Sequence, residues 1–491
     1  AFLGCDKLTV NLENGSELTS ENLGVSESQI ATYWNEGDLT WTLDADGTMT
    51  ISGTGAMKAY DTDDSPATQK KDNVNKVVIE NGITSIGAYA FYDCSGLTSI
   101  EIPESVTSIG NGAFKNCSSL TDITIPGSVT SIGEGAFSGC SSLANITIPN
   151  NVTSIGDGAF QSCSKLASIE IPEGVTSIGK GAFQGCSSLT SITIPKNVTS
   201  IGDSAFYDCG NLASIEIPSN VESIGNYAFY NCTVLKSITI PKSVASIGRN
   251  AFSGCTALTE VLLENGSTLT SENLGVDASI IRTYWKEDNL TWTLTADGTL
   301  TISGTGAMKD YSYDSPATRK KDNIKKVVIA NGITSIGEGA FCDCSNLTDV
   351  TIPGSVTSIG DFAFSWCSNL TSIEIPSSVT SIGRSAFSHT LWLTNKQNES
   401  PLVIVNGILI DGTTCSGEVT IPNDVTSIGD SAFFSCTGLT SITIPKSVTS
   451  IEEFAFFSCT GLTSITIPSS VTSIGDCAFS ACNKLPEITV P

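Results

Sequence analysis

Cysteine is the residue type that could do the most chemistry in this chain. Seventeen of the 491 residues are cysteines, and most recur at a spacing of 23 residues, at positions 94, 117, 140, 163, 186, 209, 232 and 255 and again at 344, 367, 436, 459 and 482. In a secreted protein such thiols could form disulfides. One identical slot in every repeat instead favours cysteine as a small buried residue with a free thiol. Of the close pair Cys342 and Cys344, we expect the second to belong to this series and the first to be a surface thiol.

Few residues could serve a metal centre or a histidine-dependent enzyme. The chain has one histidine, His389, and no Cys-x-x-Cys pair, so nothing closes a tetrahedral zinc site. For His389 we favour a structural role over a catalytic one, because a triad needs further partners. The carboxylates are periodic, as at Glu101, Glu170 and Glu216, which is typical of a solvated face. We therefore predict a protein that is not an enzyme and that binds no metal or cofactor.

The excess of acidic residues limits the kinds of partner that the protein can bind. The chain has 50 acidic and 24 basic residues, and its net charge is -26. Such a surface repels polyanions, so we expect no nucleic-acid partner. No stretch approaches the roughly 20 apolar residues of a membrane helix, so we expect no membrane insertion of this segment. Because Ala1-Phe2-Leu3-Gly4-Cys5 already matches the core of a repeat, we expect a signal peptide and any anchor to lie outside the sequence.

The elements that must position these residues follow from the 23-residue period. The string Val-Thr-Ser-Ile-Gly, or a close variant, occurs fourteen times. It belongs to a longer unit, which reads Leu97-x-x-Ile100-x-Ile102-Pro103-x-x-Val106-x-x-Ile109-Gly110-x-x-Ala113-Phe114-x-x-Cys117. The spacing Leu-x-x-Ile-x-Ile predicts a short strand, which the proline ends because it cannot donate to a β-ladder. The Val-x-x-Ile-Gly segment predicts a second short strand, whose glycine permits the turn into Ala-Phe-x-x-Cys.

A single coil of this kind cannot fold alone. It offers about seven buried apolar side chains, each contributing roughly 1.5 to 3 kcal/mol. Ordering its residues costs roughly 35 kcal/mol. Stacked coils share burial and backbone pairing, so the sequence predicts a β-rich repeat solenoid.

Two segments break the period and are near copies of each other. Thr40-Trp41-Thr42-Leu43 recurs as Thr291-Trp292-Thr293-Leu294. Alternating apolar residues flank Asp46-Gly47 and Asp297-Gly298, which indicates a β-hairpin in each copy. Since each copy precedes an array of repeats, we expect it to cap an apolar end, with Trp41, Trp292, Met57 and Met308 as packing residues. A sugar-binding role stays open for Tyr33-Trp34 and Tyr284-Trp285, although we favour core packing.

A third irregularity runs from 388 to 417. The cysteine slot holds Thr390, the proline slot holds Glu399, and Leu402 to Asn406 occupy the slot of the Val-Thr-Ser-Ile-Gly string. The run from Leu402 to Gly412 predicts two strands about the Asn406-Gly407 turn. We therefore expect a local hairpin in this coil.

The unit Ile-Pro-x-x-Val-Thr-Ser-Ile-Gly-x-x-Ala-Phe-x-x-Cys resembles the BspA-like leucine-rich repeat family. The resemblance covers most of the chain and implies a right-handed leucine-rich repeat coil. It also implies surface display and attachment to host proteins or other cells, as in proteins of anaerobic, mucosa-associated bacteria. The domain organisation we expect is a partial repeat at 1–13, a hairpin cap module at 14–76, array 1 at 77–263, a second cap module at 264–326, and array 2 at 327–491 with the irregular coil at 388–417.

Ligand-binding residues are expected where the repeats vary. Two variable slots flank Ala-Phe, and they hold aromatic residues at Tyr207, Tyr227 and Tyr230 in array 1 and at Phe434, Phe454 and Phe457 in array 2. The 23-residue spacing places the first and last of each set one above the other, as short aromatic ridges. Aromatic side chains are favoured contact residues, but packing on neighbouring turns is an equal alternative.

These features predict a monomeric, non-catalytic adhesin-like protein, secreted or displayed on a cell surface. We expect an extracellular protein or glycan as its ligand. The alternative is a passive spacer that presents other domains of a longer protein.

Overall fold

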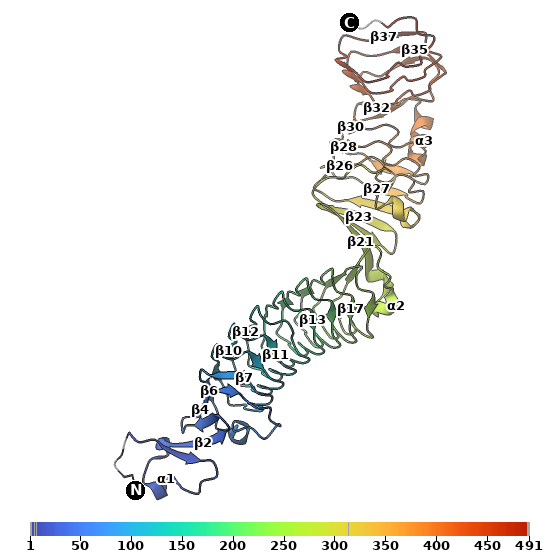
Figure 1. Ribbon diagram of the computed structural model, residues 1–491. Helices are drawn as coiled ribbons and strands as arrows, with labels where there is room; N and C mark the ends of the chain where they lie inside the picture. Colours follow the sequence, from blue (N-terminus) through green and yellow to red (C-terminus); the bar gives the residue numbers. More distant parts are fainter. Residues whose placement is uncertain (1, 4, 6, 313, 489–491) are drawn as a thin grey trace. The chain divides into compact units, whose positions relative to one another are not determined.

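The computed structural model describes residues 2, 3, 5, 7–312 and 314–488 (Figure 1). The chain divides into two compact units, one up to Ile281 and one from Arg282, and each is described by itself. The expected repeat core at Ala1 to Cys5 lies partly outside the described residues, as does the last proline of the repeat series, Pro491.

Unit 1 is a solenoid in which each coil contributes two short parallel strands (Figure 1). Residues 23 apart pair with each other, as Lys76 does with Ser99 and Ser85 with Ser108. The first ladder contains the strands β6 (Lys76–Ile79), β8 (Ser99–Glu101), β10 (Asp122–Thr124), β12 (Asn145–Thr147), β14 (Ser191–Ile192), β16 (Ser214–Ile215), β18 (Ser237–Ile240) and β20 (Glu260–Glu264). The second contains β5 (Gly55–Ala56), β7 (Ile83–Ile86), β9 (Ser108–Ile109), β11 (Ser131–Ile132), β13 (Ser177–Ile178), β15 (Ser200–Ile201), β17 (Ser223–Ile224) and β19 (Ser246–Ile247).

The repeated apolar residues fill the inside of every coil. Phe114 is fully buried, and the phenylalanines of successive coils form a stack from Phe91 to Phe252 whose ring centroids lie 5.3 to 5.7 Å apart. The glycine after the second strand has a different reason from the expected one. A Cβ on Gly110 would lie 2.5 Å from the backbone nitrogen of Ala88 in the preceding coil. Close stacking of coils therefore favours glycine at this position, although one coil of unit 2 has Glu452 there.

The repeated cysteines are buried free thiols. In ten of the thirteen, Sγ donates to the carbonyl of the phenylalanine in the preceding coil, as Cys117 does to Phe91 at 3.1 Å. This confirms the expectation of a small buried residue. The expectation for Cys342 is wrong, because its side chain is buried beside Cys344 and is not a surface thiol.

The first module continues the sheet of the solenoid. β3 (Leu39–Leu43) and β4 (Thr48–Gly53) form the expected hairpin, and β4 pairs in parallel with β6. β1 (Val10–Glu13) and β2 (Ile30–Glu36) extend the sheet outward, with α1 (Ser20–Leu23) and η1 (Glu27–Gln29) between them. Trp41 is fully buried, and its ring lies 5.7 Å from Phe91. The indole thus covers the first ring of the phenylalanine stack.

The start of the second module belongs to unit 1 rather than to the second array. Leu269 and Leu274 join the core of unit 1, and Leu274 is the last residue of α2 (Ser271–Leu274). The short helix η3 (Ala278–Ile280) follows it. The apolar end of array 1 is therefore covered by residues that follow it in the chain.

Unit 2 repeats this architecture. An antiparallel set, β21 (Ile281–Glu287), β22 (Leu290–Thr295) and β23 (Thr299–Gly304), leads into parallel ladders. One ladder contains β25 (Lys326–Ile329), β27 (Asp349–Thr351) and β29 (Ser372–Glu374), and the other contains β24 (Gly306–Ala307), β26 (Ile333–Ile336), β28 (Ser358–Ile359) and β30 (Ser381–Ile382). The last coils contain β33 (Gly417–Thr420), β34 (Ser427–Ile428), β35 (Leu439–Thr443), β36 (Ser450–Ile451), β37 (Ser464–Thr466) and β38 (Ser473–Ile474).

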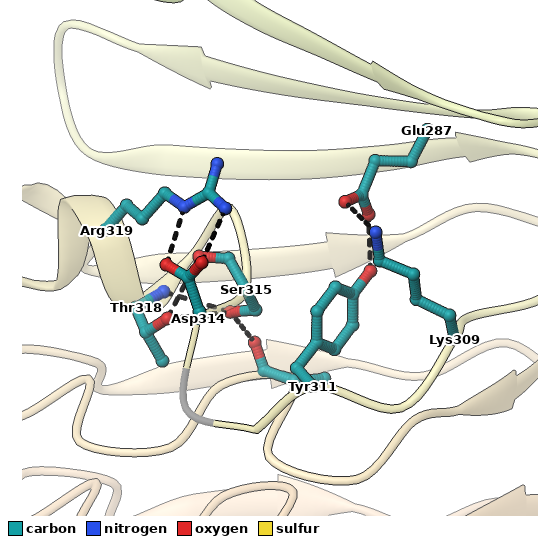
Figure 2. A network of polar contacts seen from close by, with 8 residues as sticks. Glu287, Lys309, Tyr311, Asp314, Ser315, Thr318 and Arg319 are labelled. Carbon is teal, nitrogen blue, oxygen red and sulfur yellow. Dashed lines mark hydrogen bonds and ion pairs between the residues drawn. The ribbon is translucent and has the colours of Figure 1, made fainter.

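A polar network holds the hairpin of unit 2 against the first coil (Figure 2). Glu287 of β21 accepts a hydrogen bond from the hydroxyl of Tyr311 and forms an ion pair with Lys309 at 2.8 Å. Ser315, which precedes η4 (Thr318–Asn323), donates to the carbonyl of Ala340 at 2.6 Å. Unit 1 has the same contacts among Glu36, Lys58 and Tyr60, and from Ser65 to Ala90, ahead of η2 (Thr68–Lys70). We call each set of Glu, Lys and Tyr the clamp.

The irregular coil contains the expected hairpin, β31 (Val403–Val405) and β32 (Ile408–Asp411), about Asn406-Gly407. Before it lies an unexpected helix, α3 (Leu391–Glu399). The expected slot at Leu402 to Asn406 is wrong. The repeat strand of this coil is β32, because Leu409 pairs with Ile428. The coil that ends at Leu409 is longer than 23 residues and the next coil is shorter. The two changes cancel, so the prolines on both sides keep their regular spacing.

Candidate ligand-binding surface

The turn edge consists of the Gly-x-x-Ala-Phe-x-x-Cys segments of successive coils. Two positions in each segment have left-handed backbone geometry, one before the alanine and one before the cysteine. Glycine or serine holds the first position in most coils, such as Gly112, Gly135, Gly158, Gly181, Gly339, Ser204, Ser385 and Ser431. This geometry suits small residues, because a Cβ crowds the following carbonyl.

Tyr207, Tyr227 and Tyr230 form the tyrosine ridge on the turn edge of unit 1. The rings of Tyr207 and Tyr230 stack at 4.7 Å with an angle of 12°, which confirms the predicted stacking. Tyr227 meets Tyr230 edge-on at 5.9 Å. Desolvation, and then the charge of Asp208, raise the pKa of Tyr207 above its ordinary value. The Tyr207 hydroxyl is therefore neutral and able to donate a hydrogen bond at neutral pH.

Phe434, Phe454 and Phe457 form the phenylalanine ridge of unit 2. Phe434 stacks on Phe457 at 5.1 Å, which again confirms the predicted stacking, and Phe454 meets Phe457 edge-on at 5.6 Å. Phe434 is 43% exposed although it is apolar. The guanidinium of Arg384 lies 5.9 Å from the ring of Phe454, within the range of a cation–π contact. This ridge thus presents apolar faces beside a positive charge.

Two of the ridge residues occupy left-handed positions. Tyr227 has φ of 55° and Phe454 has φ of 54°, in the slot where most coils have glycine or serine. For bulky residues this conformation is uncommon and costs about 1–2 kcal/mol. The half-buried rings are compatible with both alternatives, packing on neighbouring turns and contact with a ligand. The binding role of the six residues stays a prediction.

The turn edge of unit 1 is not flat everywhere. In unit 1 the glycine-bearing coils leave a shallow polar hollow of about 400 Å³ next to Tyr89. Lys115, Glu134 and Lys180 are among the residues that line it. The strand face, in contrast, is a row of exposed polar side chains such as Thr124, Glu170, Thr193 and Glu216. Its carboxylates lie on the solvated side, as expected.

Unit 2 has an exposed aromatic pair that was not predicted from the sequence. Trp366 is 54% exposed, and its ring stacks on the ring of His389 at 3.8 Å. Nδ1 of His389 lies 2.8 Å from the hydroxyl of Ser388. The signal was present, because Trp366 and His389 lie 23 residues apart in the slot before the cysteine, where other coils have Asn, Asp, Ser, Gly or Ala.

The tryptophans of the modules lie in the cores. Trp34 is 9% exposed and Trp285 is 7% exposed, and each pairs across its hairpin with the buried Trp41 or Trp292. Tyr284 is buried as well. This arrangement favours the packing interpretation over a sugar-binding platform at these positions.

The described residues contain no group of three or more His, Cys, Asp or Glu side chains that could hold a metal ion. Within the same part of the chain, no helix combines the length and the apolar content that a membrane crossing needs.

Sequence comparison assigns the repeats. The BspA type leucine rich repeat region, a profile of six copies, matches residues 65–190, 153–274, 315–404 and 412–491. The chain belongs to the BspA-type leucine-rich repeat family. Its coils are therefore the repeats of a leucine-rich repeat solenoid, a scaffold whose members commonly bind proteins.

Three solved structures illustrate the relatives of this BspA-type protein. A leucine-rich repeat protein from Bacteroides ovatus is 25% identical, covering 93% of this chain and 94% of that one, with a TM-score of 0.41. One from Eubacterium ventriosum is 27% identical over 73% and 94%, with a TM-score of 0.35. A leucine rich cell surface protein from Faecalibacterium prausnitzii is 25% identical over 92% and 97%, with a TM-score of 0.26. A search of curated protein sequences gave no significant match.

Proposed function

We propose that this BspA-type protein is a non-catalytic binding protein, secreted or displayed on a cell surface. It recognises an extracellular protein or glycan of a host or partner cell along the turn edge. Family membership supports surface display, and the repeat scaffold supports ligand binding. The protein works as a monomer in this proposal.

The observation that carries the proposal is the placement of bulky rings at strained positions. Tyr227 and Phe454 hold left-handed backbone geometry that glycine or serine holds in most other coils. Local strain of this kind concentrates at ligand-contact sites. Aromatic rings also offer a large contact area at a small cost in conformational entropy. The two ridges are therefore the favoured contact points.

A binding screen tests the proposal. The protein is presented to matrix proteins, mucins and surface glycans, beside the variant Tyr207→Ser, Tyr227→Ser and Tyr230→Ser. We expect specific binding that the triple variant weakens at least tenfold, because the loss of a single aromatic contact worth about 1.4 kcal/mol already gives that factor.

The matched control carries three changes on the strand face, Thr124→Ala, Glu170→Ala and Thr193→Ala. These residues lie on the same unit but on the other surface, and the control should bind like the unchanged protein. Loss of binding in the control alone would move the site to the strand face.

The second candidate function is a passive spacer. The duplicated module supports it, because both copies keep the same clamp and give the chain two similar stiffened units. A folded protein that binds nothing in the screen would favour this function.

A further inference from the structure

The irregular coil of unit 2 opens a cavity in the turn edge. In a regular coil Phe387 follows the strand residue Ile382 by five positions, whereas Gly412 follows Leu409 by three. The backbone nitrogen of Gly412 donates to the carbonyl of Ala432, as phenylalanine does in other coils. Gly412 therefore occupies the phenylalanine slot, and this coil lacks two residues of the turn.

The missing turn leaves a space of about 740 Å³ between the neighbouring coils and α3. Apolar rings and polar groups share its wall, including Phe362, Phe434, His389, Arg384, Gln397 and Asp411. The buried core of unit 2 is also divided here, with Ile408 in one cluster and Leu409 in the next. A volume of this size is in the range of small-ligand sites.

The polar groups of the cavity are held in place. Oδ1 of Asp411 accepts hydrogen bonds from Nε2 of Gln397 at 3.0 Å and from the hydroxyl of Thr413 at 3.0 Å. Arg384 reaches Asp361 at 3.5 Å, and its guanidinium lies 5.1 Å from the ring of Phe362. Its Nε is buried and has no hydrogen-bond partner among the described residues. Fixed donors and acceptors of this kind orient a ligand rather than merely attract it.

One member of the exposed aromatic pair lines the cavity. His389 lines the space and stacks on Trp366 outside it. Both residues have left-handed geometry, with φ of 59° and 62°, which is costly for side chains of this size. An exposed indole at a strained position is a second, independent sign of a contact site.

We propose that this cavity binds a neutral sugar ring at the end of a glycan. Flat aromatic faces at the rim and in the wall suit the apolar C–H face of a pyranose, and the fixed polar groups suit its hydroxyls. Asp411 lines the cavity, and Asp361 and Asp430 lie close to Arg384, so three carboxylates outnumber the one arginine of the wall, which disfavours an acidic ligand. This sugar site specifies a ligand class for the proposed binding function, and it rests on that function only in assuming that the protein binds a ligand.

Calorimetric titration of the whole protein with lactose, maltose and N-acetylglucosamine tests the proposal, with tryptophan fluorescence as a second readout. We expect at least one of these sugars to bind with a dissociation constant on the order of 1 mM, as a small polar ligand does. The charge argument adds a comparison, in which sialyllactose should bind more weakly than lactose.

Two variants of α3 form a matched pair. Thr394 is exposed and lines the cavity, so Thr394→Trp should fill it and abolish sugar binding. Asn398→Trp places the same ring on an exposed position of the same helix that does not line the cavity, and it should leave binding unchanged. Gln397→Ala should weaken binding about tenfold, because it removes a fixed polar partner.

The proposal is overturned if none of the neutral sugars binds, if Thr394→Trp binds as before, or if sialyllactose binds as tightly as lactose. The tyrosine-ridge variant separates this inference from the proposed function, because its changes lie in unit 1. If binding in the screen survives the tyrosine-ridge changes and is lost in Thr394→Trp, the cavity assignment stands and the tyrosine ridge is not the site.

Discussion

At the scale of single residues, the turn edge contains two kinds of position. Some hold buried residues that stabilise the fold, whereas the left-handed positions hold residues that vary between coils and lie at the surface. Phe229 and Cys232 are fully buried and have counterparts in nearly every coil. Tyr227 lies two residues before Phe229, yet several other coils have glycine in its slot. Stability and the proposed ligand contact are therefore assigned to different residues of the same segment.

Tyr227→Gly should change the free energy of unfolding by no more than about 1 kcal/mol. Relief of left-handed strain, about 1–2 kcal/mol, offsets the loss of the edge-on contact with Tyr230, about 0.5–1.5 kcal/mol. Phe229→Ala, two residues away, should cost about 3–5 kcal/mol, because it opens a cavity in the phenylalanine stack. Denaturant unfolding measures both changes. A loss of more than about 2 kcal/mol in Tyr227→Gly would show that the ring serves packing instead.

The sequence predicted the stacked ridges because a fixed period places residues 23 apart one above the other. It could not predict how exposed each ring is, since exposure depends on whether the neighbouring coil turns toward or away from it. Trp366 and His389 were overlooked for a related reason. Their slot has left-handed backbone geometry. A sequence indicates this geometry only indirectly, through the small or polar residues that the other coils have in the same slot.

At the scale of elements, the two clamps show how a hairpin is joined to a solenoid. The carboxylate of Glu287 comes from β21, whereas Lys309 and Tyr311 come from the segment that leads into the first coil (Figure 2). Burial, and then the hydrogen bond to Glu287, raise the pKa of the Tyr311 hydroxyl well above its usual range. The hydroxyl therefore stays a donor at all ordinary pH values.

Tyr311→Phe should lower the free energy of unfolding by about 1–3 kcal/mol, because a half-buried carboxylate loses its hydroxyl partner. Tyr60→Phe should have the same effect in unit 1, since the contacts are duplicated. Lys309→Met is the matched comparison and should cost only about 0–1 kcal/mol, because the lysine is 56% exposed and its ion pair is screened. Thermal or urea unfolding of the three variants checks the order. An equal cost for Tyr311→Phe and Lys309→Met would contradict it.

The helix α3 shows the limit of reading elements from a period. Thr390 replaces the repeat cysteine, donates to the carbonyl of Phe387 at 2.7 Å, and accepts from the backbone nitrogen of Leu393 at 3.1 Å. A threonine in this slot is a recognisable helix cap. The nine residues that follow have no apolar period, so no pattern indicated a helix. The shift of the repeat strand from Leu402–Asn406 to β32, which creates the cavity, could not be predicted either, because the prolines on both sides keep the 23-residue spacing.

At the scale of the whole molecule, the buried thiols make stability depend on pH. Burial raises the pKa of Cys140 and of Cys186 to about 12, whereas an exposed thiol titrates near 9. The folded protein therefore holds these protons more tightly than the unfolded chain does. The stabilisation is fully present below about pH 9 and is lost as the pH rises toward 12.

The free energy of unfolding should fall above about pH 9, by up to about 1.4 kcal/mol per pH unit for each such thiol. The triple variant Cys140→Ala, Cys163→Ala and Cys186→Ala should be less stable at pH 7 but should show a shallower decline. Urea unfolding at intervals between pH 7 and 11 measures both slopes. Lysine and tyrosine titration is common to the two proteins, so identical slopes would rule out the thiols as the cause.

The uniform register of the coils has a consequence for how genes of this kind change. Every regular coil pairs with its neighbours through the same positions, so a coil that is lost or gained as a whole leaves both ladders continuous. Recombination between near-identical coding segments makes such changes. We therefore expect gains and losses of whole coils to preserve the stack, whereas an insertion or deletion of one or two residues should break it unless an element such as α3 accommodates it.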